Sequence, residues 1–475
     1  MRFLAVVVVI TALAAGAGWA ALDAEATPEQ GLSGGDMRVA TPVLSVRRTP
    51  EALLETRRTN AVAAAAGTTV PAIPGASCLV VSEAGDELFA HAPTEPLTPA
   101  STQKLFVGAA LLQVMEADET FRTVAAAAAP PADGVVAGDL FVVGGGDPLL
   151  STDAYIARHS DPDRPATRVE DLADALVAAG ITEVQGSVVG DGTRYDDVRT
   201  IPSWPQRYRD QVAAGPLSGL GVNDGLETFT DTEVPVNPGR PAADPPAHTA
   251  SVITDLLRER GVTVSGDPRS GPAPEGAAEL AVLESPPAGV VVAQMLRYSD
   301  NTTAELLAKE IAVRTDSPGS TFAGITALTS VLAGQGVDVS GISLTDGSGL
   351  DTGNRATCRG LTQVLDLAGP DSPLVDGLAV AGRSGTLRER MVGTPAADNL
   401  RAKTGSLRHV SALAGLVDAA DGHTYTFAYI ANVPEGEFMP GADLVVQESL
   451  AVALATLPPV EPPPNILPQA PIPAG

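Results

Sequence analysis

Short apolar runs with polar breaks predict two β-hairpins, one near each end of the chain. The four runs are Cys78–Ser82, Glu87–His91, Val410–Val417 and Thr424–Val433. The first two flank Ala84-Gly85 and the last two flank Asp421-Gly422, and both pairs suit a tight turn between antiparallel strands. Further strands are predicted at Leu140–Val143 and Val184–Val189.

Helical periodicity fills much of the remaining chain. The predicted helices span Lys104 to about Met115, 169–179, 249–260, 286–297, 300–313, 320–333 and 442–457. One more helix is predicted to start with Thr49 as its N-cap and Pro50 at its first position. Proline and glycine predict loops at Pro235–Pro246 and Ser265–Gly276. Together these elements predict an α/β fold.

The N-terminus predicts export. Arg2 precedes an apolar run from Phe3 to Ala21 that ends in small residues, which is typical of a secretory signal. Gly18-Trp19-Ala20 and Ala24-Glu25-Ala26 are the candidate cleavage sites. An uncleaved membrane anchor is the alternative, because the run is nearly long enough to span a bilayer. In both cases the body of the protein is expected outside the cytoplasm.

Composition narrows the possible partners. A formal net charge of −27 argues against a nucleic-acid partner, because the chain could not neutralise a run of phosphates. The five histidines are scattered without ligand spacing, so the sequence predicts neither a metal site nor a cofactor. The two cysteines, Cys78 and Cys358, are either a disulfide or two buried thiols, and the sequence leaves both open.

Lysine is rare in this chain, and its positions point to chemistry. The chain has only three lysines, Lys104, Lys309 and Lys403, beside 27 arginines. A buried lysine can lose its proton whereas an arginine effectively cannot, so lysine is expected where arginine would fail. Lys309 has a simpler explanation, because Glu305 four residues earlier predicts an ion pair on a helix surface.

Ser101 and Lys104 form the first candidate motif, S-x-x-K at the start of a predicted helix. Positions i and i+3 share one helix face, and the free backbone N–H groups of a helix N-terminus lie close by. A serine nucleophile, a neighbouring base and oxyanion-stabilising donors would then lie within one helical turn. Lys104 can act as the base only if burial or another cation, such as Lys403, lowers its pKa.

Two further motifs are less specific alone. Ser299-Asp300-Asn301 is predicted to start a helix with Ser299 as N-cap, and such caps are common. Lys403-Thr404-Gly405-Ser406 precedes a strong strand, which predicts a position at a strand end or edge where a lysine and hydroxyls suit a carboxylate. The alternative for this segment is an exposed turn.

The order S-x-x-K, S-D-N, K-T-G is the signature of penicillin-recognising serine acyl-transferases. With it, the chain resembles the class C low-molecular-mass penicillin-binding proteins, the D-Ala-D-Ala carboxypeptidase/endopeptidase family. Further segments that carry the resemblance are Thr98-Pro99-Ala100-Ser101, Gly144-Gly145-Gly146-Asp147-Pro148, Asp346-Gly347-Ser348-Gly349-Leu350 and Gly385-Thr386-Leu387. The long stretch from Lys104 to Ser299 also fits, because simpler relatives have a short connection there.

The resemblance implies a penicillin-binding/β-lactamase-like transpeptidase fold, an antiparallel sheet flanked by helices. A large insertion of one or two smaller domains would separate the first and second motifs. The expected divisions are a signal or anchor at 1–26, a linker at 27–42, a discontinuous catalytic domain at 43–128 and 277–457, an insert at 129–276 and a proline-rich disordered tail at 458–475.

The resemblance also implies roles for residues. Ser101 would be the nucleophile, Lys104 the general base and Ser299 a proton relay to the leaving amine. The residues implied in binding are Asn301 on the substrate amide, Lys403 and Thr404 on the terminal carboxylate, Ser406 with Ser101 in the oxyanion hole and, as a weaker candidate that can equally be a turn residue, Asp147. After Leu350 many members have Ser-Arg where this chain has Asp351-Thr352, which leaves the acyl-donor preference open.

The implied activity is that of a serine-type D-alanyl-D-alanine carboxypeptidase or endopeptidase. Its partners would be peptidoglycan stem peptides, with β-lactams as covalent inhibitors, in the periplasm or cell-wall space. The alternatives are a serine β-lactamase, which the long insert disfavours, and a non-catalytic wall-binding or penicillin-sensing protein, which the intact motifs disfavour.

Overall fold

The computed structural model describes residues 51–233 and 236–460, and the side chains from Leu53 onward within the first helix. The predicted signal, the linker, the Thr49-Pro50 helix start and the tail from residue 461 lie outside the described residues. Within the described ranges, no helix combines the length and the apolar character needed to cross a bilayer.

A six-stranded sheet is the centre of the body, and all of its neighbouring strands are antiparallel. Its strands in spatial order are β15 (Ala379–Val380), β16 (Leu400–Leu407), β17 (Val410–Asp418), β18 (Thr424–Asn432), β1 (Ala76–Glu83) and β2 (Asp86–His91). Both predicted hairpins are confirmed as β1–β2 and β17–β18. At the first turn Ala84 and Gly85 both have positive φ angles, 49° and 92°, as a two-residue type I′ turn requires.

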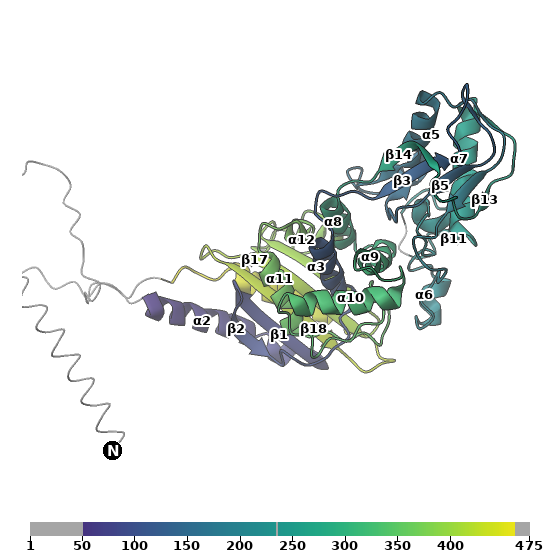
Figure 1. The fold of residues 1–475 in the computed structure, drawn as a ribbon. Coiled ribbons are helices and arrows are strands. Elements are labelled where there is room, and N and C mark those ends of the chain that lie inside the picture. Colours follow the sequence, from purple (N-terminus) through teal and green to yellow (C-terminus); the bar gives the residue numbers. More distant parts are fainter. Residues whose placement is uncertain (1–50, 234–235, 461–475) are drawn as a thin grey trace, which may run out of the picture. The chain divides into compact units, whose positions relative to one another are not determined.

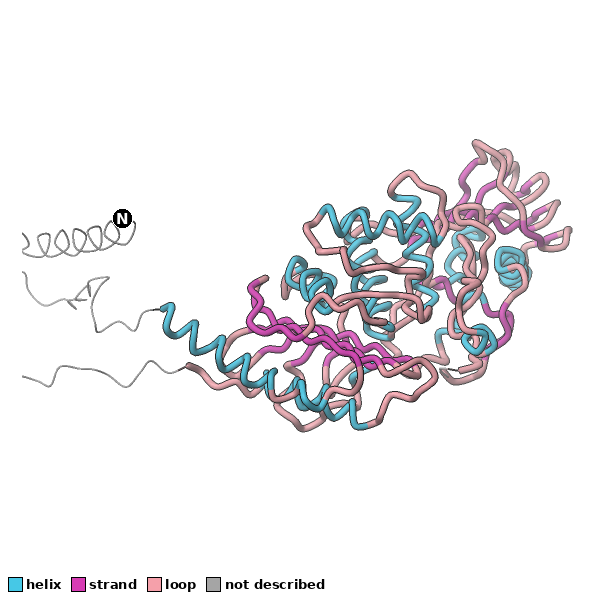
Figure 2. The backbone as a smooth tube through the Cα atoms, turned by 90° about the horizontal axis from the view of Figure 1, so that it is seen from below, coloured by secondary structure: helices cyan, strands magenta, loops and turns pink. Residues whose placement is uncertain are grey.

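Alternate residues of the sheet serve two separate cores. On β1, Cys78 and Val80 belong to one core, and Leu79 and Val81 belong to the other. The first core packs against most of the helices, and the second packs against α2 and α13. The sheet therefore lies between two helical layers, as the strands and helices of Figure 2 also show.

The helices predicted at 104–115, 286–297, 300–313, 320–333 and 442–457 are confirmed, whereas those at Cys358–Ala368 and Pro373–Asp376 were not predicted. The helices that pack on the central sheet or on one another are α2 (Glu51–Gly67), α3 (Lys104–Val114), α8 (Ala288–Tyr298), α9 (Asn301–Arg314), α10 (Thr321–Gly334), α11 (Cys358–Ala368), α12 (Pro373–Asp376) and α13 (Ala442–Ala455). Single-turn 3₁₀ segments are η1 (Val70–Ala72), η2 (Ala100–Gln103) and η4 (Gly385–Leu387). Figure 1 shows α3, α9, α10 and α11 grouped on one face of the sheet.

The segment between α3 and α8 builds its own mixed sheet. Its strands in spatial order are β13 (Arg269–Ser270), β9 (Val188–Asp191), β5 (Leu140–Val143), β3 (Arg122–Ala127) and β14 (Ala278–Glu284). The first and last of these strands in the sequence, β3 and β14, pair antiparallel from Arg122 to Ala127. The expected insert limits, 129 and 276, lie within two residues of the inner ends of β3 and β14.

Smaller elements complete this segment, which we call the insert and take as residues 122–284. They are β4 (Val135–Val136), β6 (Leu150–Ser151), α4 (Asp153–Ile156), β7 (Thr167–Arg168), α5 (Val169–Ala178), β8 (Glu183–Val184), α6 (Gln206–Asp210), η3 (Asn223–Gly225), β10 (Leu226–Phe229), β11 (Gly239–Pro241), α7 (Pro245–Glu259) and β12 (Thr263–Val264). A separate apolar core, which includes Leu172 and Ile253, lies between α5, α7 and the insert strands.

Three predictions within the insert are wrong, one of them the loop at Ser265–Gly276, which contains β13. The predicted strand at Val184–Val189 is two strands, β8 and β9, because the backbone around Gly186 leaves one ladder and joins another. The predicted loop at Pro235–Pro246 contains β11 and the start of α7. That helix begins at Pro245 rather than Thr249, because Asp244 caps it by accepting from the backbone N–H of Ala247.

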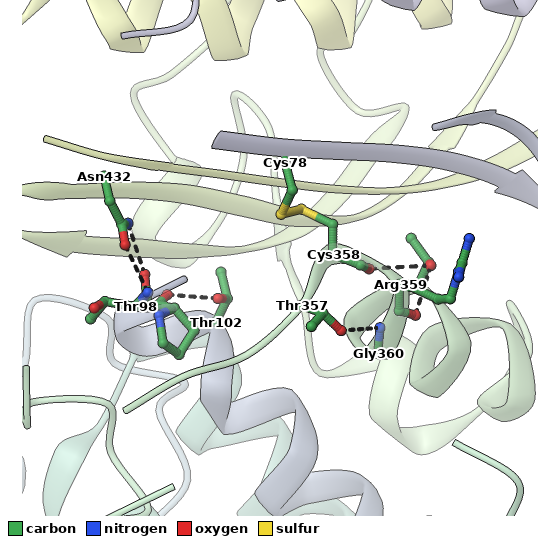
Figure 3. The surroundings of a disulfide bond; sticks show 10 residues. Cys78, Thr98, Thr102, Thr357, Cys358, Arg359, Gly360 and Asn432 are labelled. Carbon is green, nitrogen blue, oxygen red and sulfur yellow. Dashed lines mark hydrogen bonds between the residues drawn. A yellow bond between two sulfur atoms is a disulfide. The ribbon is translucent and has the colours of Figure 1, made fainter. Parts of the chain in front are cut away.

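Cys78 and Cys358 form a disulfide that closes a sequence separation of 280 residues. It links β1 to the first residue of α11, and Figure 3 shows it beside the Thr357 N-cap. Two residues before Cys358, the backbone of Ala356 forms paired hydrogen bonds with Leu97. The disulfide therefore holds residues 356–358 in place beside Leu97, which lies four residues before Ser101 in the chain.

Candidate active site

Ser101 and Lys104 lie on consecutive turns, η2 and the first residue of α3. The Nζ of Lys104 lies 3.0 Å from the Oγ of Ser101, so the predicted geometry of the S-x-x-K motif is present. Ala100 has a positive φ of 48° directly before Ser101, and its carbonyl faces Gly349. A Cβ at Gly349 would lie 2.1 Å from that oxygen, so only glycine fits there.

Lys104 is fully buried and holds three oxygen contacts. Besides Ser101, its Nζ contacts Oδ1 of Asn301 at 2.8 Å and the carbonyl oxygen of Ser348 at 2.6 Å. Burial lowers the pKa of Lys104 to about 8, although the negative charges of Asp346, Glu305 and Asp300 raise it. A lysine of this pKa is partly neutral near neutral pH and can accept a proton from a serine.

Ser299 adopts a role different from the predicted one. It is the C-cap of α8, in the left-handed region at φ 60°, and not the N-cap of α9. Asp300 is the N-cap, because its Oδ1 accepts from the backbone N–H of Thr303 at 3.0 Å. Ser and Asp are about equally good N-caps, and here the left-handed turn at Ser299 ends α8 and leaves Asp300 to start α9. The left-handed turn leaves the hydroxyl of Ser299 facing Lys403.

Lys403 donates from Nζ to the Oγ of Ser299 at 2.8 Å and to the carbonyl of Thr404 at 2.8 Å. Burial and the neighbouring charge of Lys104 lower the pKa of Lys403 well below its usual range. For Lys104 itself, burial is the cause of the lowered pKa, which is one of the two causes expected from the sequence.

The K-T-G segment lies within β16, with its outer edge open. Within the described part of the chain, β15 pairs only with residues 401 and 402 of β16, so the edge from Lys403 onward has no strand partner. Gly405 packs against the turn that carries Ser101, and a Cβ there would lie 2.7 Å from the carbonyl oxygen of Pro99. Thr404 donates to the hydroxyl of Thr386, and the side chain of Ser406 is exposed.

A cavity of about 380 Å³ adjoins the Ser299-Asp300-Asn301 segment. Asn301 lies on the wall of this cavity. It links α9 to the insert, because its Nδ2 donates to the carbonyl of Ala213 at 2.7 Å. Arg164 of the insert pairs with Asp300 at 3.1 Å and stacks over the Tyr298 ring. The insert thus lines the cavity beside Ser299 and Asn301, whereas Ser101, Lys104 and Lys403 are not among the residues that line it.

Two buried carboxylates, Asp346 and Glu305, also lie close enough to Lys104 for their charges to act on it. The Oε1 of Glu305 accepts from the backbone N–H of Ser348 at 2.7 Å, and burial raises the pKa of Glu305 to about 7. Trp204 of the insert donates from Nε1 to Asp346 at 2.7 Å. Asp346 and Trp204 were not predicted at the site, although the Asp346-Gly347-Ser348-Gly349-Leu350 segment was a signal for Asp346, and Glu305 was predicted only as a partner of Lys309.

The predicted surface pair between Lys309 and Glu305 is wrong. Both side chains are fully buried, since every residue from Thr302 to Ala312 of α9 is buried. Lys309 instead forms an ion pair with Asp196 of the insert. Asp147 lies in the turn after β5, where its Oδ1 accepts from the backbone N–H of Leu149 at 2.9 Å, and it is not among the residues that line the cavity beside Ser299.

The fold is that of the penicillin-binding proteins. The structure of penicillin binding protein 4 from Haemophilus influenzae matches it with a TM-score of 0.69 and 20% sequence identity, over 82% of this chain and 99% of that chain. A second structure of that protein, in complex with a β-lactam, matches with a TM-score of 0.62 and 21% identity, over 81% and 97% of the two chains.

The chain belongs to the D-Ala-D-Ala carboxypeptidase 3 (S13) family, whose model matches residues 60–243 and 233–443. A D-alanyl-D-alanine carboxypeptidase of Actinomadura sp. strain R39 is 31% identical over 81% of this chain and 82% of its own length. Carboxypeptidase DacB of Mycolicibacterium smegmatis is 32% identical over 74% and 75%. Family membership confirms the predicted resemblance to class C penicillin-binding proteins and the predicted enzyme class, a serine-type carboxypeptidase.

Proposed function

We propose that this protein removes the terminal D-alanine from peptidoglycan stem peptides through an acyl-enzyme on Ser101. The observation that carries the proposal is the 3.0 Å contact between the Oγ of Ser101 and the Nζ of a fully buried Lys104. A nucleophile is activated when a base with a suitable pKa lies within hydrogen-bond reach. Carboxypeptidase relatives that align with most of the chain support the same reaction.

In the acylation step, neutral Lys104 takes the proton of the Ser101 hydroxyl. The Oγ forms a bond to the carbonyl carbon of the penultimate D-alanine, and the bond from that carbon to the terminal D-alanine nitrogen breaks. The proton passes from Lys104 through the hydroxyl of Ser299 to the leaving amine. The 2.8 Å contact between Ser299 and Lys403 orients the relay hydroxyl.

Substrate binding uses the open edge of β16. An extended peptide can add to an unpaired strand edge through main-chain hydrogen bonds. Lys403 and Thr404 would hold the terminal carboxylate, and the backbone N–H groups of Ser101 and Ser406 would stabilise the oxyanion. An amide nitrogen has two hydrogens, so Asn301 can keep its bond to Ala213 and still donate to a substrate carbonyl.

The second half-reaction completes the cycle. A water molecule attacks the ester carbon and gives a proton to Lys104. The bond between that carbon and the Oγ of Ser101 then breaks, and Lys104 returns the proton to the Oγ, which restores the Ser101 hydroxyl. An amine from another peptide can take the place of water, and endopeptidase action on a cross-link follows the same two steps. We also place the reaction outside the cytoplasm, on the basis of the predicted secretory signal and the cell-wall substrate.

β-Lactams fit this proposal as covalent inhibitors, because their strained amide would acylate Ser101. The amine of the opened ring stays attached to the acyl group, so it does not leave and make room for the water that hydrolyses the ester. The H. influenzae relative has been crystallised with a β-lactam, which supports this part.

Mass measurement tests the proposal directly. The full chain is incubated with benzylpenicillin, its intact mass is measured, and the adduct is located by peptide mapping. One adduct on Ser101 is expected, together with D-alanine release from a pentapeptide that is lost in Ser101→Ala. An adduct on another residue, or undiminished D-alanine release by Ser101→Ala, would overturn the proposal.

A further inference from the structure

Asp346 is a fully buried carboxylate that lies outside all three motifs of the site. A buried charge is costly unless hydrogen-bond donors compensate for the lost water. Asp346 has such donors on both oxygens. Its Oδ1 accepts from the backbone N–H of Gly349 at 2.9 Å and from Nδ2 of Asn354 at 2.8 Å, and its Oδ2 accepts from the backbone N–H of Asp351 at 2.8 Å.

The fourth strong donor comes from the insert. Nε1 of Trp204 lies 2.7 Å from Oδ2 of Asp346, and the indole is 2% exposed. Trp204 belongs to an apolar cluster that joins insert residues to Leu306 and Leu350 of the body. An indole N–H can only donate, so this contact is suited to a charged carboxylate.

Asp346 acts on Lys104 through the backbone between them. The carbonyl of Ser348, two residues after Asp346, accepts from the Nζ of Lys104 at 2.6 Å. Gln103, the residue before Lys104, donates from its side chain to the carbonyl of Asp346 and to Oδ1 at 3.2 Å. Glu305 fixes the same loop from α9 through the backbone N–H groups of Gly347 and Ser348.

We infer that Asp346 is a positioning residue for Lys104, that Trp204 of the insert holds it, and that its charge sets the pH at which Lys104 becomes a base. The inference rests on the proposed role of Lys104 and gives the insert a part in catalysis. Burial lowers the pKa of Lys104, and nearby negative charges raise it. The charge of Asp346 raises it most, ahead of those of Glu305 and Asp300. The charge of Lys104 in turn lowers the pKa of Lys403 on β16, because two like charges repel.

The sign of the effect follows from these charges. A negative charge near Lys104 favours its ammonium form, so removal of the Asp346 charge should make Lys104 neutral at lower pH. The rate constant of acylation should then reach its plateau at lower pH, while the disturbed loop lowers the plateau itself. A purely structural role would lower the plateau without moving the rise.

The experiment measures the second-order rate constant for acylation by a fluorescent penicillin between pH 5 and 10. In Asp346→Asn the rise is expected to move to lower pH by roughly 1 unit, as removal of a nearby opposite charge predicts. Glu305→Gln is expected to move it in the same direction by less, and it serves if Asp346→Asn does not fold. The control is Glu310→Gln, a fully buried carboxylate on the same helix that pairs with Arg194 and Arg314, where the rise should stay in place.

Trp204→Phe keeps an aromatic ring but removes the N–H donor, and its plateau is expected to fall several-fold. An unchanged profile in Trp204→Phe would remove Trp204 from the inference. A rise at the wild-type pH in Asp346→Asn, or in Glu305→Gln if Asp346→Asn does not fold, would overturn the role of Asp346. Mass mapping separates the two proposals: if Ser101 is not labelled in the wild type, the proposed function fails, whereas labelled Ser101 with unmoved profiles defeats this inference alone.

Discussion

Removal of the Cys78–Cys358 disulfide should lower the stability of the body far more than the lost packing of the two cysteine side chains would. The bond joins residues 280 positions apart, so it prevents the unfolded chain from exploring a very large set of conformations. The chain-entropy relation for a loop of this length gives a loss of about 5–6 kcal/mol at 25 °C for Cys78→Ala/Cys358→Ala. Both cysteines are fully buried, so the variant also loses some packing.

Urea unfolding followed by circular dichroism measures this loss. Wild-type protein reduced with excess thiol keeps both sulfur atoms and separates the lost cross-link from the lost packing. Thr357→Ala is a matched control at the same helix end, because it removes only the N-cap bond to the backbone N–H of Gly360, at a cost of about 1 kcal/mol. If the double variant and the reduced protein lose no more stability than Thr357→Ala, the reasoning from chain entropy is refuted.

Further predictions concern the lysines and one glycine. Lys104→Arg should slow penicillin acylation about 10²–10⁴-fold, because a guanidinium cannot serve as base, and an unchanged rate would contradict the mechanism. In the wild type the acylation rate should rise with pH up to about 8, where Lys104 loses its proton, and a flat profile from pH 6 to 9 would contradict this assignment. Lys309→Met should leave acylation within threefold but cost about 1–3 kcal/mol in urea unfolding, because Asp196 loses its partner, and slow acylation would show that Lys309 has another role. Gly349→Ala should lower stability by more than about 1 kcal/mol and slow acylation, because its Cβ would collide with the carbonyl of Ala100, and a wild-type melting curve would contradict the close approach.

Strong local patterns predicted much of the fold. The hairpins and the helices α3, α8, α9 and α10 follow from periodicity and turn residues, which act over a few positions. The S-x-x-K geometry was predictable for the same reason, because helix spacing alone brings Ser101 to Lys104.

The failures arise where distant segments decide the outcome. A Glu-to-Lys spacing of four predicted a surface pair on α9, but packing by the body and the insert buries that helix on all sides. The contact between Trp204 and Asp346 joins residues 142 positions apart, and no local pattern reports such a pairing. At Ser299-Asp300 two good capping residues stand side by side, so composition could not decide which of them starts the helix.

The pairing of β3 with β14 means that the insert leaves and re-enters the body at one point. Phe121 and Ser285, just outside those strands, exchange hydrogen bonds, from the backbone N–H of Ser285 to the carbonyl of Phe121 and from the backbone N–H of Phe121 to the hydroxyl of Ser285. Because its two ends already meet, such a segment adds almost no loop-closure entropy to the folding of its host, whatever its length. The length of the insert can therefore vary at little cost to the folding of the body, as long as its contacts with the body are kept, among them those at Asp346, Asn301, Asp300 and Lys309.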